Sequence, residues 1–209
     1  MADNTHAMQT DDASTLAPGP LRRAVTAVAL ANLAYFFVEF FVARNIGSVS
    51  LLADSIDFLE DASVNFLILV ALGWSVRNRA RVGMALAAIL LVPAVTLLWT
   101  AWQKFGTPTP PEPWLLSTTG LGALIVNLSC AGLLAKFRHH SGSLTRAAFL
   151  SARNDAYANI AIILAGLVTL SWHSGWPDLV VGLGIAIMNA DAAKEVWLAA
   201  RNEHRSAAP

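Results

Sequence analysis

The stretch LLADSIDFLEDASVN, residues 51–65, carries four carboxylates within eight residues, at Asp54, Asp57, Glu60 and Asp61. Strongly apolar sequence lies on both sides, ANLAYFFVEFFVARNIG before it and FLILVALGW after it. A charged side chain inside a bilayer is costly and by default marks a functional site. The stretch therefore predicts a membrane helix with functional acids. The alternative is a short loop at the membrane surface in which residues 51–61 are not buried.

The composition also indicates a membrane protein. The chain has 209 residues, of which 56% are hydrophobic and 13% charged, and its mean hydropathy is +0.53. Soluble domains carry about 25% charged residues. The formal net charge is zero, which gives no reason to expect a nucleic-acid partner. The single cysteine, Cys130, leaves no disulfide framework within the chain, and it is interpreted as an inert core residue.

Six stretches are long and apolar enough to cross a bilayer, which takes about 20 residues per helix. They predict an all-α, six-helix integral membrane domain over residues 21–200. Residues 1–20 are polar, lack the features of a secretory signal, and are expected to be a disordered cytoplasmic tail, with a second short tail at 201–209. The six predicted spans are 24–44, 50–74, 81–103, 114–134, 144–172 and 178–199.

The loops predict the orientation, because Lys and Arg are enriched on the cytoplasmic side of a membrane. Only Arg44 and Lys104 fall on one side. The other side is therefore expected to be cytoplasmic and to hold both termini. Its eleven basic residues are Arg22, Arg23, Arg77, Arg79, Arg81, Lys136, Arg138, Arg146, Lys194, Arg201 and Arg205.

The acids of the second predicted span have counterparts in the fifth. Positions i and i+4 share one face of a helix, so Asp57 and Asp61 point the same way, as do Ser151 and Asp155. Together these faces predict an oxygen-lined site for a divalent cation. The predicted metal ligands are Asp57, Asp61 and Asp155, and weaker candidates on the same faces are Ser151, Asp54 and Asn159.

The depths of these acids in the membrane match. At 1.5 Å per residue, Asp61 lies about 15 Å inward from Leu51, and Asp155 lies about 14 Å inward from Arg146. The hydrocarbon layer is about 30 Å thick. If the second and fifth spans pack antiparallel, Asp61 and Asp155 meet near the midplane, with Asp57 close by.

The two motifs resemble those of the cation diffusion facilitator family. GSVSLLADSIDFLEDASVN, residues 47–65, is similar to the second-helix signature, in which D-x-x-x-D or H-x-x-x-D follows S-x-(A/S)-L-L-A-D. AAFLSARNDAYANIAIILAGL, residues 147–167, is similar to the fifth-helix motif, usually H-x-x-x-D. The resemblance covers about residues 24–200. It implies a six-helix transporter of the bacterial inner membrane that exchanges a divalent metal, most often zinc, for protons.

The resemblance implies that Asp57 and Asp61 are the second-helix ligands and Asp155 the fifth-helix aspartate. Ser151 occupies the position of the usual fifth-helix histidine, and a hydroxyl is a poor zinc ligand. The expected substrate is zinc, manganese, iron or cobalt, and no cofactor is expected. A homodimer is expected from the resemblance alone. The family's cytoplasmic C-terminal domain is not expected, since the chain stops soon after the sixth span.

Proton coupling has a basis in the residues themselves. Three carboxylates crowded in a low dielectric cannot all stay ionised without a cation, and they titrate as a coupled set. Metal entry is expected to expel protons, and protons to expel metal. Antiport is the hypothesis that follows.

Other polar residues within the spans have several interpretations. Arg153 forms an ion pair with Glu60 or Glu39, takes part in gating, or extends its guanidinium to the membrane surface. Glu39 is otherwise a candidate proton relay. Asn127 is expected to form interhelical hydrogen bonds, and Asp178 is expected to be a helix cap.

Two rival functions differ in kind from a transporter. A CDP-alcohol phosphotransferase needs D-x-x-D-G-x-x-A-R, but Phe58 follows Asp57 and no A-R follows at the required spacing. We therefore expect no enzyme. The remaining alternative is a non-transporting membrane scaffold, or a metal-handling partner with the same fold.

Overall fold

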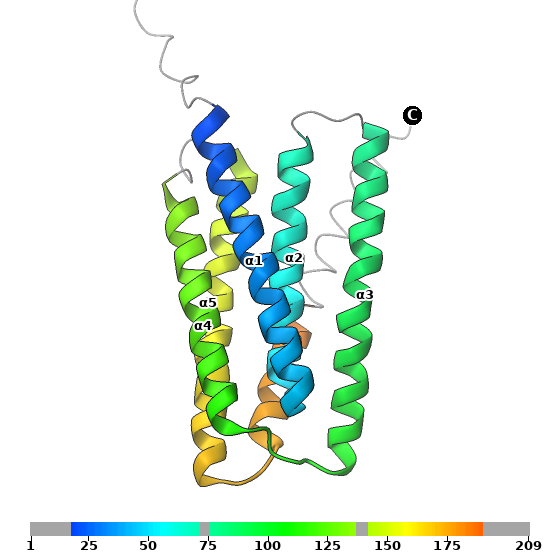
Figure 1. Ribbon diagram of the computed structural model, residues 1–209, viewed down its shortest axis with the longest axis vertical. Coiled ribbons are helices and arrows are strands. Elements are labelled where there is room, and N and C mark those ends of the chain that lie inside the picture. Colours follow the sequence, from blue (N-terminus) through cyan, green and yellow to red (C-terminus); the bar gives the residue numbers. More distant parts are fainter. Residues whose placement is uncertain (1–17, 72–75, 137–141, 190–209) are drawn as a thin grey trace, which may run out of the picture.

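The protein is a bundle of helices (Figure 1). The computed structural model describes residues 18–71, 76–136 and 142–189, and within these ranges it leaves the side chains at 18, 68, 70, 71, 76–88, 90, 91 and 142–153 outside the description. Every regular element in the described ranges is a helix. The helices are α1 (Pro18–Ile46), α2 (Val49–Ala71), α3 (Val76–Gly106), α4 (Pro113–Ala135), α5 (Gly142–Ser171) and a further segment, Trp176–Asn189, which we call the sixth helix.

Within the described residues, these helices match the six predicted spans. Residues 190–199 of the sixth predicted span, most of the first predicted tail and all of the second lie outside the described residues. Residues 51–61 lie inside α2, and Leu51 and Leu52 are fully buried, so the alternative of a surface loop is wrong. The main difference is at the first helix, which begins at Pro18, not near Ala24. Proline is tolerated in the first turn of a helix because the N–H groups there have no partner within the helix.

A glycine with a positive φ and a helix N-cap determine where two of the helices begin. Gly47 has a φ of 66°, a left-handed conformation that glycine adopts without steric cost, and it turns the chain from α1 into α2. Glu112 caps α4, since its carboxylate accepts hydrogen bonds from the backbone N–H groups of Trp114, at 3.1 Å, and Leu115.

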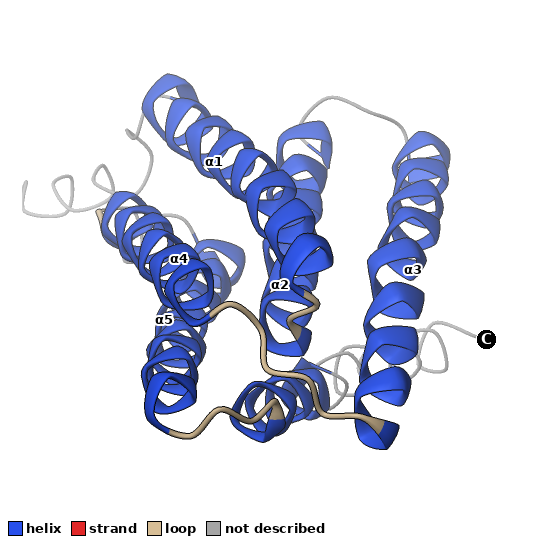
Figure 2. Ribbon diagram, turned by 60° about the horizontal axis from the view of Figure 1, so that its bottom comes forward, coloured by secondary structure: helices blue, strands red, loops and turns tan. Residues whose placement is uncertain are grey.

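The helices pack as antiparallel pairs. The most extensive contacts join α4 to α5 and α1 to α2, with α3 against α2 at the edge of the bundle (Figures 1 and 2). Helices α2 and α5 also touch, as the sequence predicts. The α1–α2 turn, the α3–α4 loop and the α5–sixth helix loop all lie at one end, which we call the Gly47 end.

The outer surface of the bundle is apolar. Three described helices are long and apolar enough to cross a membrane, namely Gly19–Ile46, Pro113–Ala135 and Asn154–Ser171, and the sixth helix is a shorter apolar one. Helix α2 carries the four acids. Large apolar side chains face outward, for example Trp102, Leu98 and Val180, with 75%, 68% and 61% of their surface exposed. Exposure of such a surface to water is energetically unfavourable, whereas lipid tails would solvate it.

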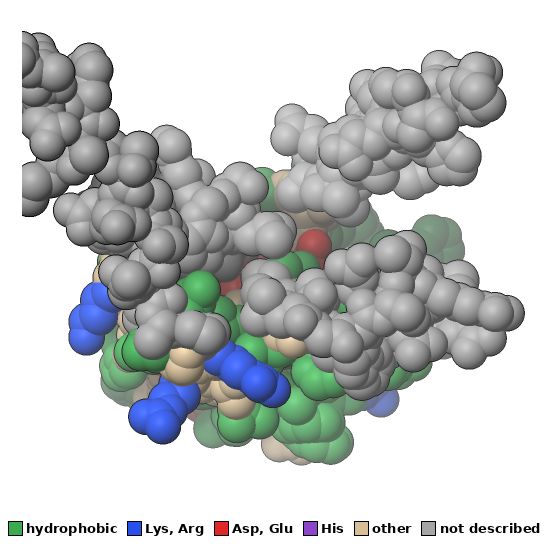
Figure 3. Space-filling view, turned by 90° about the horizontal axis from the view of Figure 1, so that it is seen from above, with side chains coloured by type: hydrophobic (Ala, Val, Ile, Leu, Met, Phe, Trp, Pro, Cys, Tyr) green, Lys and Arg blue, Asp and Glu red, His purple; other side chains and the backbone are tan. Residues whose placement is uncertain are grey.

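Basic side chains gather at the end opposite Gly47. Figure 3 looks onto this end and shows Lys and Arg side chains near its edge. The described ones include Arg22, Arg23 and Lys136, all exposed. Lys104, at the Gly47 end, is buried. This asymmetry fits the predicted orientation, with the basic end in the cytoplasm.

A buried carboxylate holds the Gly47 end together. Asp178, in the sixth helix, accepts hydrogen bonds from the hydroxyl groups of Ser48 and Ser50 at 2.6 and 2.7 Å, and from the backbone N–H groups of Val49 and Ser50 at 2.9 and 3.1 Å. The ammonium group of Lys104, at the end of α3, donates to it at 3.2 Å. Asp178 is thus a helix cap, as predicted, but it caps the N-terminus of α2, where the helix dipole favours an anion.

The sixth helix approaches α2 closely at Gly182. A Cβ atom added there would lie 2.6 Å from the Val49 carbonyl carbon and 2.6 Å from the Ser50 nitrogen. Both are backbone atoms that cannot rotate away, so only glycine fits at this contact.

We predict that Gly182→Ala separates the sixth helix from α2 and lowers the thermal unfolding midpoint of the purified protein in detergent. Gly184→Ala is the matched control, because a Cβ at Gly184 meets nothing within 4 Å. Alanine in a helix is favoured over glycine by up to about 1 kcal/mol, so the control is expected to match or exceed the wild type. Equal midpoints for the two variants would contradict the close contact.

Candidate metal site

The acids of α2 differ in burial. Asp54 is fully buried, Asp57 and Asp61 are half-buried, and Glu60 is exposed. A helix turns by about 100° per residue, so Glu60 lies farthest from Asp54 around the helix axis. Three of the four acids therefore face the interior of the bundle, and the fourth points away from it.

The α5 aspartate faces these acids. Asp155 is half-buried and lies within electrostatic range of Asp61, Asp54 and Glu60, and Asp57 in turn lies within range of Asp155. The structure thus brings the predicted ligands of α2 and α5 into one region. Among the described residues, no three His, Cys, Asp or Glu side chains are close enough to enclose a metal ion.

A chain of amide groups fixes how α5 lies against α2. The Asn159 side-chain N–H donates to Asp54 Oδ2 at 2.5 Å, and Asn127 of α4 donates to Asn159 Oδ1 at 2.9 Å. Because the helices are antiparallel, the turn of α5 at Asp155 is level with the turn of α2 at Asp57. The membrane depths predicted from the sequence instead placed Asp155 level with Asp61, which lies one helical turn beyond Asp57 on α2.

Asp57 has a partner that the sequence did not reveal. The side-chain N–H of Asn189, in the sixth helix, donates a hydrogen bond to Asp57 Oδ1. This bond orients the carboxylate of Asp57. Asn189 could not be found from spacing, since nothing in the sequence gives the rotation of the sixth helix about its axis.

Several predicted interactions lie outside the described side chains. Ser151 and Arg153 belong to α5, and Ser151 precedes Asp155 by one turn, but their side chains are not described. The pairing of Arg153 with Glu60 or Glu39 therefore stays a prediction. Cys130 is buried, and its thiol donates to Asn32 Oδ1 at 3.7 Å, which agrees with an inert core residue.

Glu39 lies beside Asp54. The two carboxyl groups are fully buried and within hydrogen-bonding reach of each other. The sequence held a signal for this contact, because Glu39 precedes Gly47 by eight residues and Asp54 follows it by seven. An antiparallel helix pair that turns at Gly47 brings those two positions to the same depth.

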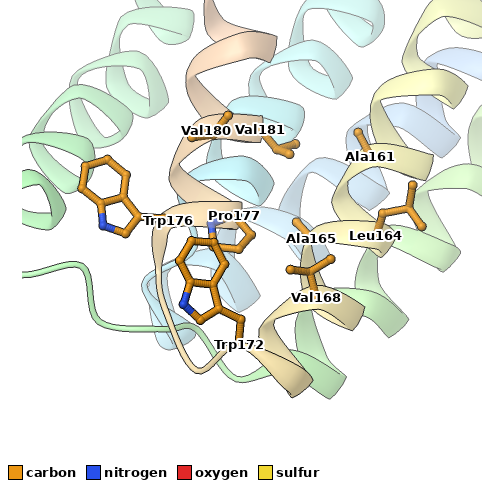
Figure 4. A pocket seen from close by; sticks show the side chains of 9 residues that line it. All are labelled: Ala161, Leu164, Ala165, Val168, Trp172, Trp176, Pro177, Val180 and Val181. Carbon is orange, nitrogen blue, oxygen red and sulfur yellow. The ribbon is translucent and has the colours of Figure 1, made fainter.

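A separate apolar groove of about 660 Å³ lies between α5 and the sixth helix, near the Gly47 end. Figure 4 shows Trp172 and Trp176 beside it. No polar side chain lines it. It therefore offers no metal ligand, and its lining suits lipid tails.

Comparison with known proteins gives a consistent picture. The profile of the cation efflux transmembrane domain matches residues 25–198. The chain is 28% identical over 183 residues to the cation-efflux pump FieF of Salmonella typhi, and 29% identical over 187 residues to that of Escherichia coli O1:K1 / APEC. In both cases the match covers 80% of this chain and 60% of the relative. The chain thus spans less than two thirds of the length of these relatives.

We predict that Asn159→Ala destabilises the bundle by about 1–3 kcal/mol, because it leaves Asn127 and Asp54 Oδ2 buried without their partner. Denaturant titration of the purified protein, followed by circular dichroism, measures the change. Ser129→Ala is the control, since Ser129 is exposed on α4 and its hydroxyl donates to the carbonyl of Ile125 in its own helix. A loss no greater than that of the control would contradict a structural role for the amide chain.

Proposed function

Since the chain belongs to the cation efflux family, whose members are transporters and not enzymes, we propose that it carries a divalent metal cation across the bacterial inner membrane, out of the cytoplasm. The observation that supports this most directly is the approach of carboxylates from α2 and α5 inside a lipid-facing bundle. Carboxylates at membrane depth are costly unless a cation or a proton accompanies them.

The transported cation binds between α2 and α5 in this proposal, at Asp57, Asp61 and Asp155. Ser151 lies one turn from Asp155 and is level with Asp61 in the register set by Asn159. It supplies a hydroxyl or a bound water where a histidine is usual. Because all of these ligands are oxygen atoms, hard cations such as Mn²⁺ are favoured over zinc relative to a site with imidazole.

Asp54 and Asn159 have a different role in this proposal. Each is engaged in the amide chain that joins α2, α5 and α4. They hold α2 and α5 in register and do not contact the transported ion at the Asp57 site.

Protons move against the metal in this proposal. Half-buried carboxylates in mutual electrostatic range cannot all remain ionised once the cation leaves. Proton binding therefore accompanies metal release, and proton release accompanies metal binding.

We predict that purified protein in proteoliposomes takes up Mn²⁺, and that Asp57→Ala and Asp155→Ala each abolish most of this uptake. Loss of an outer partner of a metal ligand costs about 10–100-fold in affinity, and loss of a ligand is expected to cost at least as much. Uptake should rise when the vesicle interior is made more acidic than the exterior, because protons leaving the vesicle then drive metal inward.

The control for this experiment is Glu60→Gln, since Glu60 is exposed on the same helix. It is expected to transport at the wild-type rate. Uptake that ignores the pH gradient would exclude antiport. A folded wild type that moves no metal would favour a scaffold or a metal-handling partner over a carrier.

We further predict that Ser151→His shifts the preference of the transporter toward zinc, because imidazole is a better zinc ligand than a hydroxyl. The measurement is uptake from a mixture of Zn²⁺ and Mn²⁺ by wild-type and variant vesicles, expressed as the ratio of the two metals. Ser151→Ala separates loss of the hydroxyl from gain of the imidazole. An unchanged ratio in the histidine variant would mean that Ser151 is not at the site.

A further inference from the structure

Glu39 and Asp54 form a second pair of carboxyl groups that the proposed transport site does not use. Glu39 projects from α1 and Asp54 from α2, and both side chains are fully buried. The two groups lie within hydrogen-bonding reach of each other. Asp54 precedes Asp57 by three residues, so the pair lies about 4–5 Å closer to the Gly47 end than Asp57.

Three of the four carboxyl oxygens of this pair have no hydrogen-bond donor among the described residues. Among the described residues, neither oxygen of Glu39 has a hydrogen-bond donor, and neither does Asp54 Oδ1. The nearby Tyr35 hydroxyl donates to the backbone oxygen of Thr119 at 2.7 Å and is thereby engaged elsewhere. Three buried carboxyl oxygens of the pair thus have no hydrogen bond from the described residues. Buried groups of this kind are normally paired or coordinate a metal.

Asp54 is held in the orientation that creates this arrangement. Its Oδ2 accepts the hydrogen bond from Asn159, and Asn127 fixes Asn159 in turn. The other oxygen, Oδ1, is buried and has no hydrogen-bond donor among the described residues. Such bonds from neighbouring groups orient the carboxylates of metal sites and help to fix their affinity.

We propose that Glu39 and Asp54 bind a divalent cation, separately from the ions held at Asp57, Asp61 and Asp155. Two carboxylates neutralise a divalent cation, and hard ions such as Mn²⁺ and Mg²⁺ are commonly held by one or two carboxylates, with water completing the shell. The pair lies between the transport site and the Gly47 end, where it receives a cation that leaves Asp57 in that direction. The inference rests on the proposed function, because the cation bound by Glu39 and Asp54 is the one that the protein transports.

The test is to count bound Mn²⁺ per chain by equilibrium dialysis and metal analysis of the purified full chain in nanodiscs. Glu39→Gln removes one charge, while the new amide can donate to Asp54 Oδ1 and preserve the fold. Asp155→Asn removes a charge from the transport site. We expect each variant to lose one bound ion and the double variant to lose both, with Glu60→Gln retaining the wild-type count.

The outcomes separate the two sites. If Glu39→Gln keeps the wild-type count, the inference is overturned and the pair holds only a proton. If Asp155→Asn keeps the wild-type count while Glu39→Gln loses an ion, the Glu39 pair stands and the proposed transport site fails. A wild-type count no higher than that of the double variant contradicts both. Circular dichroism and size-exclusion chromatography of each variant show that a lost ion does not reflect a lost fold.

Discussion

A carboxylate inside a membrane bundle must be given hydrogen bonds or a positive charge, and this requirement organises the protein. Asp178 has five hydrogen-bond donors, including Lys104, although it is fully buried. Those donors come from the α1–α2 turn, the start of α2 and the end of α3. One carboxylate therefore joins the sixth helix, the α1–α2 turn, α2 and α3. Replacing Asp178 would leave buried donors unpaired, and replacing the side chain of Lys104 would remove the positive charge that faces this buried carboxylate.

The same requirement separates acids whose oxygens are paired from acids whose oxygens are not. Asp178 is fully satisfied by its protein partners and has no capacity left for a ligand. Glu39 and Asp54 are equally buried, but three of their oxygens have no donor among the described residues. Among the described residues, Asp57 accepts a hydrogen bond from Asn189 at Oδ1. The number of donors, and not burial alone, indicates which carboxylates are available to a cation.

The sequence predicted the helices well and the contacts between them only in part. Span limits follow from apolar length, and the approach of α2 to α5 follows from matched motifs, so both could be foreseen. The Lys104–Asp178 pair joins positions 74 residues apart, and its existence depends on where α3 ends and where the sixth helix begins. The spacing of residues in the sequence also could not predict the hydrogen bond from Asn189 to Asp57, or the one-turn shift that places Asp155 level with Asp57. Both depend on the rotation and register of the helices, which packing determines.

The four acids of LLADSIDFLED differ because each meets a different neighbour as α2 turns. Successive steps of 100° place Asp57 about 60° and Asp61 about 20° from Asp54, on one side of the helix, and Glu60 about 120° away. Asp54 thereby reaches Glu39 on α1 and Asn159 on α5, while Asp57 reaches Asn189 on the sixth helix. Glu60 falls outside this sector and is exposed. Carboxylates on successive turns of α2 therefore face different helices, so the environment of each carboxylate depends on a different pair of packed helices.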